Sequence, residues 1–217
     1  MRYSHSAQGK TRPPQALDPR KQPTQSRATE TVNAVLEAAA RILEKHGFEG
    51  YTTNAIAERA GVSIGSLYQY FPGKDAVTVA LIERELTLLS ADVTEADSIA
   101  DYRDAMHHLI KAAVTHQMRR PKLARLLDFE QSRLPIAPRI RHVTDAIHRT
   151  LLRTFSRPGA PYIRNMQEAA FDLIAIAKGI VDAAGERGET DAHRLEERVR
   201  RAVYGYLGIS SPSRRGL

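Results

Sequence analysis

Hydroxyl, amide and phenol side chains follow one another closely between Thr52 and Lys74, in the run TTNAIAERAGVSIGSLYQYFPGK. Side chains of these types donate and accept hydrogen bonds, and they are short or flat enough to reach phosphate oxygens and base edges in a DNA major groove. The chemistry that this run indicates is therefore hydrogen-bonded recognition. The elements that position these groups decide which of them face outward.

Two short helices joined by a tight turn are predicted for this run. The hydroxyls of Thr52 and Thr53 can cap the first helix, and Gly61 can end it because glycine adopts the left-handed conformation without a side-chain clash. Ser63 is expected to cap the second helix. Ala57 is small enough for the close crossing of two helices at a sharp angle. This pattern is typical of a helix-turn-helix.

The second short helix is expected to turn Leu67 and Tyr70 inward and to present its other face to DNA. Gly65 would allow a close backbone approach there. Lys74 precedes a further helix expected from Asp75, and a helix N-terminus and an ammonium group both attract a phosphate. The outward set consists of Ser63, Ile64, Ser66, Tyr68 and Gln69.

The run GVSIGSLYQYFPGKDAV, preceded by TTNAIAERA and a longer amphipathic helix, resembles the DNA-binding domain of the tetracycline-repressor (TetR-like) family of bacterial transcriptional regulators. The resemblance implies that Thr53 and Asn54 approach the DNA backbone from the first helix. It also implies that Tyr70 and Lys74 hold phosphates. The groove would receive Ser63, Ile64, Ser66, Tyr68 and Gln69, of which Ile64 and Gln69 occupy positions that vary in such proteins. The operator sequence therefore cannot be carried over.

The N-terminal segment is strongly basic. Residues 1–27 carry six basic side chains against Asp18 alone, which accounts for most of the chain's formal net charge of +7. Four prolines and the lack of apolar periodicity predict a disordered arm over these residues. Arg20, Lys21 and Arg27 are expected to reach DNA phosphates or the minor groove. The alternative is a solvated tail, above all for residues 1–19.

The rest of the chain has apolar residues at helical spacing, which predicts an all-α fold. We expect a three-helix DNA-binding domain with the helix-turn-helix over residues 28–75. A larger helical ligand-binding and dimerisation domain would follow over residues 76–217, with residues 76–90 as the connecting helix. Further helices are expected over residues 98–119, 121–133, 138–155, 163–187 and 191–208, with breaks at proline and glycine.

The resemblance further implies a homodimer, because in that family the last two long helices pair with those of a second copy in a four-helix bundle. A dimer would place two recognition helices in successive major grooves, roughly 34 to 36 Å apart. Alternatively both helices complete the monomer core, since periodicity does not separate an interface from a core. The expected interface consists of Phe171, Ile174, Lys178, Val181, Leu195, Val199, Val203 and Tyr206.

An inducer binds inside the C-terminal domain in the family that the chain resembles. Polar and aromatic side chains of the middle helices are candidates for contacting such a small molecule, although each of them could equally be a surface or core residue. The candidates are His107, His108, Gln117, Phe129, Glu130 and Arg133, with His116 and His142 as further members of the group. We expect no cofactor and no bound metal, because neighbouring histidines on a helix point about 100° apart.

Several classes of protein are disfavoured. The 217 residues include no cysteine, and the N-terminus has no apolar signal region. No stretch approaches the roughly 18 apolar residues of a membrane helix, so we expect a cytoplasmic protein. Without a glycine-rich phosphate loop, a nucleophile elbow or paired metal ligands, an enzyme is not expected.

The sequence predicts a repressor that binds a palindromic double-stranded DNA operator and is released by a small molecule. The alternative is a helical protein–protein adaptor that keeps the helix-turn-helix shape, which the neutral charge of residues 51–75 supports.

Overall fold

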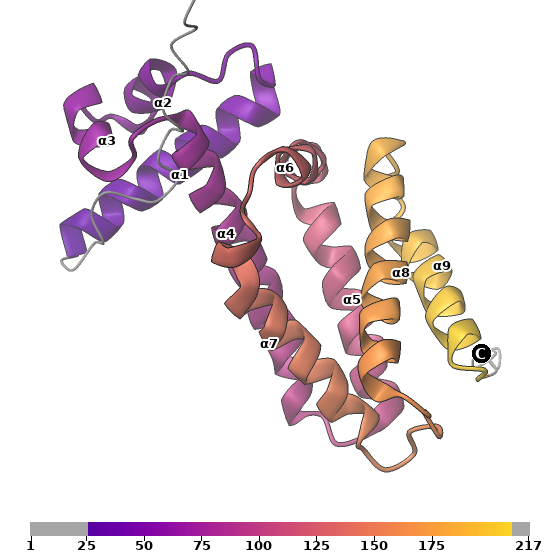
Figure 1. Ribbon diagram of the computed structural model, residues 1–217. Coiled ribbons are helices and arrows are strands. Elements are labelled where there is room, and N and C mark those ends of the chain that lie inside the picture. Colours follow the sequence, from indigo (N-terminus) through magenta and orange to yellow (C-terminus); the bar gives the residue numbers. More distant parts are fainter. Residues whose placement is uncertain (1–25, 210–217) are drawn as a thin grey trace, which may run out of the picture.

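The computed structural model describes residues 26–209, which form α-helices joined by short connections (Figure 1). Three of the helices, α1 (Ser26–His46), α2 (Thr53–Ala60) and α3 (Ile64–Tyr70), form a head at one end of the molecule. The longer α4 (Lys74–Thr94) leads out of the head and runs beside the rest of the helices, which we refer to together with α4 as the body.

The body continues with a short 3₁₀ helix and five α-helices. These are η1 (Glu95–Ser98), α5 (Tyr102–Arg119), α6 (Pro121–Arg133), α7 (Ala137–Phe155), α8 (Met166–Glu186) and α9 (Ala192–Tyr206). Helices α4 and α7 pack side by side, α8 and α9 form the side away from them, and α6 lies at the end of the body nearest the head (Figure 1). The predicted all-α fold, with an N-terminal helix-turn-helix and a larger helical region, is confirmed.

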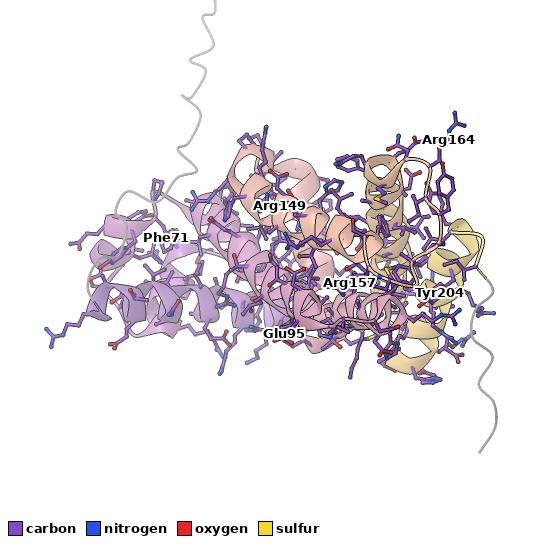
Figure 2. The ribbon with its side chains drawn as sticks, turned by 90° about the horizontal axis from the view of Figure 1, so that it is seen from below. Phe71, Glu95, Arg149, Arg157, Arg164 and Tyr204 are labelled. Carbon is purple, nitrogen blue, oxygen red and sulfur yellow. The ribbon has the colours of Figure 1, made fainter. Side chains whose placement is uncertain are left out.

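Two apolar cores hold these helices together. The first core joins the head to α4 and also includes residues of α6, so the head does not have a core of its own. Phe71, just after α3, marks this core within the head in Figure 2. Its members include Val35, Leu43, Ile56, Leu67, Phe71, Val77, Leu81, Leu123 and Leu127.

The second core lies among α5, α7, α8 and α9. Tyr204 of α9 belongs to it and lies at the opposite end of the molecule from Phe71 (Figure 2). The inward-facing side chains of the last two helices are completely enclosed within one protomer. Members of this core include Tyr102, Met106, Phe155, Leu173, Val181, Leu195, Val199 and Val203.

The observed helix bounds agree with the predicted ones in part. Helix α6 covers the predicted residues 121–133, whereas α4 continues to Thr94 instead of ending near residue 90. The helix expected over residues 98–119 begins only at Tyr102, because η1 ends at Ser98 and the chain is not helical between them. Because α1 begins at Ser26, the exposed Arg27 lies on a helix and not in a disordered arm. The expectation for Arg20 and Lys21 falls outside the described residues.

Candidate nucleic-acid interface and internal cavity

The corner between α2 and α3 is built by local hydrogen bonds that the sequence predicted. Thr52 caps α2, with its hydroxyl oxygen accepting from the amide of Ala55 at 3.1 Å. Gly61 takes the left-handed conformation with a φ of 68°, where glycine is strongly favoured. Ser63 then caps α3 by accepting from the amide of Ser66 at 3.0 Å. These interactions fix how α3 leaves the turn.

Helix α3 has one buried face and one exposed face. Leu67 is completely buried in the first core, and Tyr70 packs partly against it. Ile64 and Tyr68, by contrast, are 38% and 40% exposed although they are large side chains on so short a helix. Burying Leu67 therefore turns the opposite face of α3 toward solvent.

The predicted outward residues share one surface. Ser63, Gly65 and Gln69 are exposed and Ser66 is half-buried, with the Ser63 and Ser66 hydroxyl oxygens 2.8 Å apart. From α2, the Thr53 hydroxyl lies 3.2 Å from the Tyr68 hydroxyl. Asn54, next to Thr53, is exposed. The two helices thus contribute hydroxyl and amide groups to a continuous surface. We refer to the ten residues Thr53, Asn54, Ser63, Ile64, Gly65, Ser66, Tyr68, Gln69, Tyr70 and Lys74 as the α3 surface.

Lys74 is exposed and is itself the first residue of α4, one position earlier than the predicted helix start. Gly73 precedes it and carries no side chain to cap the first turn. The free amide groups of a first turn carry partial positive charge, so they add to the charge of the lysine ammonium group. This end of the α3 surface is therefore suited to an anionic group.

A cavity of about 300 Å³ lies inside the body, between helices α4 to α8. Its wall is mostly aliphatic, with Leu123 and Leu127 of α6 among the lining residues. His116 and Gln117 also line it, and the Nδ1 of His116 and the Nε2 of Gln117 are buried without a hydrogen-bond partner among residues 26–209. Burial lowers the pKa of the His116 imidazole, because water no longer solvates its charged form.

Of the six predicted ligand contacts, only Gln117 lines this cavity. His107 is exposed and its Nδ1 lies 3.4 Å from a carboxylate oxygen of Glu196. The Nε2 of His108 is 2.7 Å from the backbone oxygen of Asp92. Both rings thus turn toward neighbouring helices, and neither residue lines this cavity.

The three candidates on α6 also lie outside the lining of this cavity. Phe129 is 61% exposed, with its ring centroid 6.1 Å from that of Phe48 in the head. Glu130 is buried, but it is paired with Arg133, whose guanidinium group also donates to Asp75 at 3.0 Å. These residues lie where α6 meets the head, because α6 turns a different face, with Leu123 and Leu127, to the cavity.

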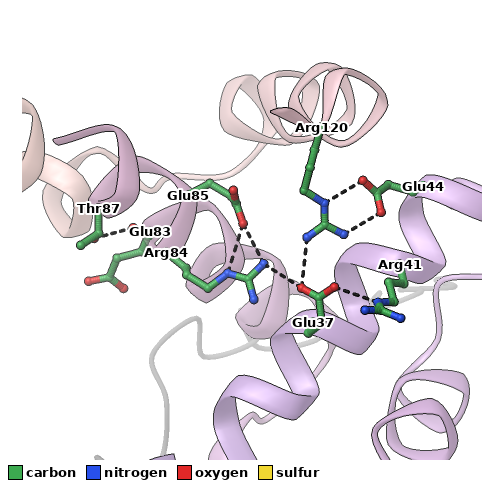
Figure 3. A network of polar contacts seen from close by, with 8 residues as sticks. All are labelled: Glu37, Arg41, Glu44, Glu83, Arg84, Glu85, Thr87 and Arg120. Atoms are coloured by element: carbon green, nitrogen blue, oxygen red, sulfur yellow. Dashed lines mark hydrogen bonds and ion pairs between the residues drawn. The ribbon is translucent and has the colours of Figure 1, made fainter. Parts of the chain in front are cut away.

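Sequence reasoning did not select Arg120, which connects the body to the head (Figure 3). Its Nε and Nη2 donate to the two carboxylate oxygens of Glu44 at 2.7 and 2.6 Å, and its Nη1 donates to Glu37 at 3.1 Å. Glu37 also receives a hydrogen bond from Arg41 and lies 3.6 Å from Arg84. Arg120 stands between α5 and α6 and also lines the cavity. Its position just before Pro121 was visible in the sequence, but its partners lie far away along the chain.

The pKa values of this cluster show that its charges are mutually stabilised. Hydrogen bonding to Glu44 raises the pKa of Arg120 against the opposing effect of burial. Burial works to raise the pKa of Glu37, but Arg41 and Arg120 together hold that pKa below its ordinary value. Glu37 and Arg120 therefore both stay ionised at neutral pH, and their contact links α1 to the α5–α6 corner.

The predicted dimer residues divide into two groups. Phe171 and Tyr206 are exposed, Lys178 is about half exposed, and Ile174 is partly buried. The remaining four are buried inside a single protomer. They are Val181, Leu195, Val199 and Val203, all members of the second core.

Two negative results apply to the described part of the chain. Across residues 26–209, no cluster of three or more histidine, aspartate or glutamate side chains is arranged to hold a metal ion. Within the same residues, no helix combines the length and apolar character needed to cross a membrane.

A helix-turn-helix with an exposed polar face, joined to a helical body that encloses a cavity, defines a class of bacterial regulatory protein. The profile described as bacterial regulatory proteins, tetR family, matches residues 35–81, and a tetracycline repressor-like C-terminal domain profile matches residues 101–207. The chain belongs to the tetR family of bacterial regulatory proteins.

Curated relatives match over short segments of the chain. The transcriptional repressor KstR of Mycolicibacterium smegmatis is 39% identical over 62 residues, which are 29% of this chain and 30% of that protein. The class C tetracycline repressor of Escherichia coli is 41% identical over 64 residues, covering 30% of this chain and 29% of its own. The aligned segments thus span less than a third of either relative.

Solved structures match over most of the chain and show that the fold is shared. The fatty acid degradation regulator FadR of Bacillus halodurans superposes with a TM-score of 0.66 at 20% identity, covering 80% of this chain and 97% of that one. FadR of Bacillus subtilis in complex with stearoyl-CoA gives a TM-score of 0.67 at 16% identity, with 83% and 99% coverage.

Proposed function

We propose that two copies of this chain bind a palindromic DNA operator and repress transcription until a small molecule enters the cavity and releases them. The observation that carries this proposal is the two-sided character of α3. Leu67 anchors the helix in the core, while Ile64 and Tyr68 stand exposed on the opposite side. Large exposed side chains of this kind are typical of a surface that contacts a partner. The surrounding hydroxyl and amide groups can form hydrogen bonds with DNA.

Roles within the α3 surface follow from side-chain chemistry. Gln69 carries an amide that can both accept from and donate to an adenine edge, so we assign it to base recognition. Lys74, at the start of α4, and Thr53, on α2, are assigned to the phosphates on either side of the groove. Arg27 lies exposed on α1 and is assigned to the backbone as well. This division predicts sequence selectivity from α3 and general affinity from the flanking groups.

The outer faces of α8 and α9 support a dimer. Phe171 and Tyr206 are exposed there, at 64% and 44%. Gly179 of α8 and Gly205 of α9 are also exposed and have open space where a side chain would begin. A second pair of helices could approach closely at such positions. We propose that this face pairs with its copy about a two-fold axis.

Helix α6 is proposed to couple ligand binding to DNA binding. Leu123 and Leu127 belong to the first core, which holds the head, and they also line the cavity. Arg120, one residue before α6, is bonded to Glu37 and Glu44 of α1. A ligand that shifts α6 therefore shifts the support of the head. It releases DNA to the extent that it binds the released form more tightly.

A binding assay with the promoter region flanking the protein's own gene tests this function. We expect sequence-selective binding at moderate salt, with a two-fold symmetric footprint. A scrambled fragment of the same length serves as the control. Binding that is equally weak on both fragments, with the dimer intact, would favour the adaptor alternative over the repressor.

A further inference from the structure

We infer that the effector of this cavity is an uncharged, largely apolar molecule with one hydrogen-bonding head group, and that His116 and Gln117 receive that group. The inference rests on the proposed function, because it names the chemical class of the releasing ligand. Three features of the cavity point to this ligand: its apolar wall, the pairing of its charged side chains, and its two unpartnered polar groups.

The wall of the cavity favours an apolar ligand. Aliphatic side chains from α4, α5, α6, α7 and α8 supply most of it, among them Leu86, Met106 and Leu173. A volume of about 300 Å³ stands at the lower end of the range for small-molecule sites. Transfer of apolar surface from water into such an enclosure is favourable in proportion to the area removed. A short alkyl chain or a compact hydrocarbon frame fits this description.

The basic side chains of the wall are already neutralised. Arg120 is bonded to Glu44 and Glu37 of the head, as Figure 3 shows. Arg119 donates to Asp92 at 2.9 Å. An anionic head group would therefore have to compete with carboxylates that are already in place.

The third basic group, Lys178 of α8, is held by two carboxylates. Its ammonium group lies 2.6 Å from Asp182 and 3.3 Å from Asp128. Burial acts to lower the pKa of Lys178, but these carboxylates raise that pKa above its ordinary value. The remaining acidic group, Glu85, is bonded to Arg84 at 2.7 Å. Each charged side chain of the wall thus has a partner of opposite sign, and three acidic groups balance three basic ones.

A charged ligand is disfavoured by this balance. An ion that enters an apolar cavity loses its hydration, and it recovers that loss only if it meets an opposite charge that is free to pair. Within residues 26–209, the charged groups lining the cavity are all engaged with one another or with residues outside it. A neutral ligand avoids this cost.

The two unpartnered groups, on His116 and Gln117, favour a ligand with a polar head group. A buried donor or acceptor without a partner is costly, and a ligand atom that satisfies it gains the corresponding free energy. The amide nitrogen of Gln117 is a donor, and the neutral imidazole of His116 can donate or accept at Nδ1 depending on its tautomer. A hydroxyl group can serve either atom, because it donates and accepts. Both atoms are shielded from water, and in the proposed complex a small rotation of the side chain brings either of them to the head group.

Gly185 provides the room for Gln117. A Cβ atom at position 185 would lie 2.1 Å from the Gln117 amide nitrogen, so the amide group occupies space that only a glycine leaves open. The end of the Gln117 side chain is thereby held against α8, beside the cavity that this residue lines. In the proposed complex, a rotation of this side chain brings its amide group to the ligand.

The test compares three eight-carbon molecules whose head groups are neutral, anionic or cationic. Calorimetric titration of the full chain at pH 7.5 would use 1-octanol, octanoate and octylammonium. We expect 1-octanol to bind about tenfold more tightly than either ion. Tighter or equal binding of octanoate or octylammonium would overturn the inference, and so would no binding of any of the three.

A matched variant tests the role of Gln117. Gln117→Met keeps the side-chain length but removes the donor, so the affinity for 1-octanol should fall about fivefold while that for octane, added as octane-saturated buffer, stays unchanged. Gln167→Met, at an exposed position of α8, should change neither affinity. Equal loss for octanol and octane in Gln117→Met would overturn the assignment of the head group.

The outcome also separates this inference from the proposed function. If 1-octanol binds preferentially but does not affect operator binding, the inferred class of ligand is supported. The same result would count against the proposal that the ligand releases DNA. Release of operator by octanoate, with octanol inactive, would keep the release mechanism and overturn the neutral ligand.

Discussion

In the head, the hydroxyl and phenol groups of α2 and α3 stand at the surface and bond to one another, as Thr53 does with Tyr68. In the body, the Nδ1 of His116 and the Nε2 of Gln117 are buried and have no hydrogen-bond partner among the described residues. On the proposed function, the head offers its hydrogen-bonding groups to a large molecule that cannot enter the fold. The body would offer them to a small molecule in the cavity.

The two regions differ in their binding surfaces but share a supporting helix. Leu123 and Leu127 of α6 contribute to the core under the head and to the wall of the cavity. A shift of α6 at the cavity would therefore also move residues of the core under the head, without a separate signalling element. On the proposed coupling, the boundary between head and body takes part in the function of the protein.

Removing the buried anchor of α3 should have the largest effect. Leu67→Ala deletes a fully buried side chain and leaves a cavity, which we expect to cost about 2 to 5 kcal/mol of unfolding free energy. Tyr68→Ala, at the next position, is exposed and should change stability by no more than about 0.5 kcal/mol. Urea unfolding measures both values. Similar losses in the two variants would mean that the buried and exposed faces of α3 are wrongly assigned.

A charged side chain on the outer face of α8 should break the dimer. Gly179→Arg places a bulky cation in open space on each protomer, and a two-fold axis brings it against the same face of the partner. We expect the dimer dissociation constant to rise about 100-fold or more. Sedimentation velocity measures this change. Thr87→Arg on the exposed side of α4 is the control, and equal effects of the two substitutions would remove α8 from the interface.

Loss of Arg120 should have a smaller effect that depends on salt. Arg120→Met removes the bidentate contact with Glu44, for which we expect about 1 kcal/mol lower unfolding free energy. The deficit should shrink in 1 M NaCl, because the wild-type ion pairs are then screened. Arg41→Met removes an exposed pair within α1 and should cost less. A deficit that is independent of salt would indicate lost packing instead of lost charge.

The smallest expected effect is the change in unfolding free energy that accompanies the titration of His116. Its folded pKa lies below the ordinary value of 6.5, mainly because of burial, with Glu85 and Asp92 opposing and Arg119 and Lys178 reinforcing the shift. The unfolded chain then binds the proton more readily. The unfolding free energy therefore has its full value above about pH 6.5, and it decreases as the pH drops toward the folded pKa. His116→Gln should flatten this part of the profile. An identical pH profile in wild type and variant would contradict the shift.

The head could be predicted from sequence because its signals are local. The cap at Thr52, the turn at Gly61 and the cap at Ser63 each depend on residues within four positions along the chain, and the structure confirms all three. Pro121 likewise predicted the start of α6. The exposed face of α3 followed from the burial of Leu67, which the helical period determines.

The cavity could not be predicted in the same way. Whether a residue of α5 faces the cavity depends on how α4, α6, α7 and α8 pack around it, so Gln117 lines the cavity while His107 and His108 do not. The dimer interface is difficult to predict from sequence for a similar reason. Val199 and Val203 follow the period expected for a contact surface, and they are buried in the protomer because a core has the same period.

The most direct test of the central claim is the operator affinity of Tyr68→Ala beside that of Tyr162→Ala, measured by fluorescence anisotropy on the promoter fragment. Tyr162 is 92% exposed and lies between α7 and α8, so the second variant makes the same substitution away from the α3 surface. We predict about tenfold weaker binding for Tyr68→Ala and unchanged binding for Tyr162→Ala, with both proteins equally stable. Unchanged operator affinity in Tyr68→Ala would contradict the assignment of this surface to DNA.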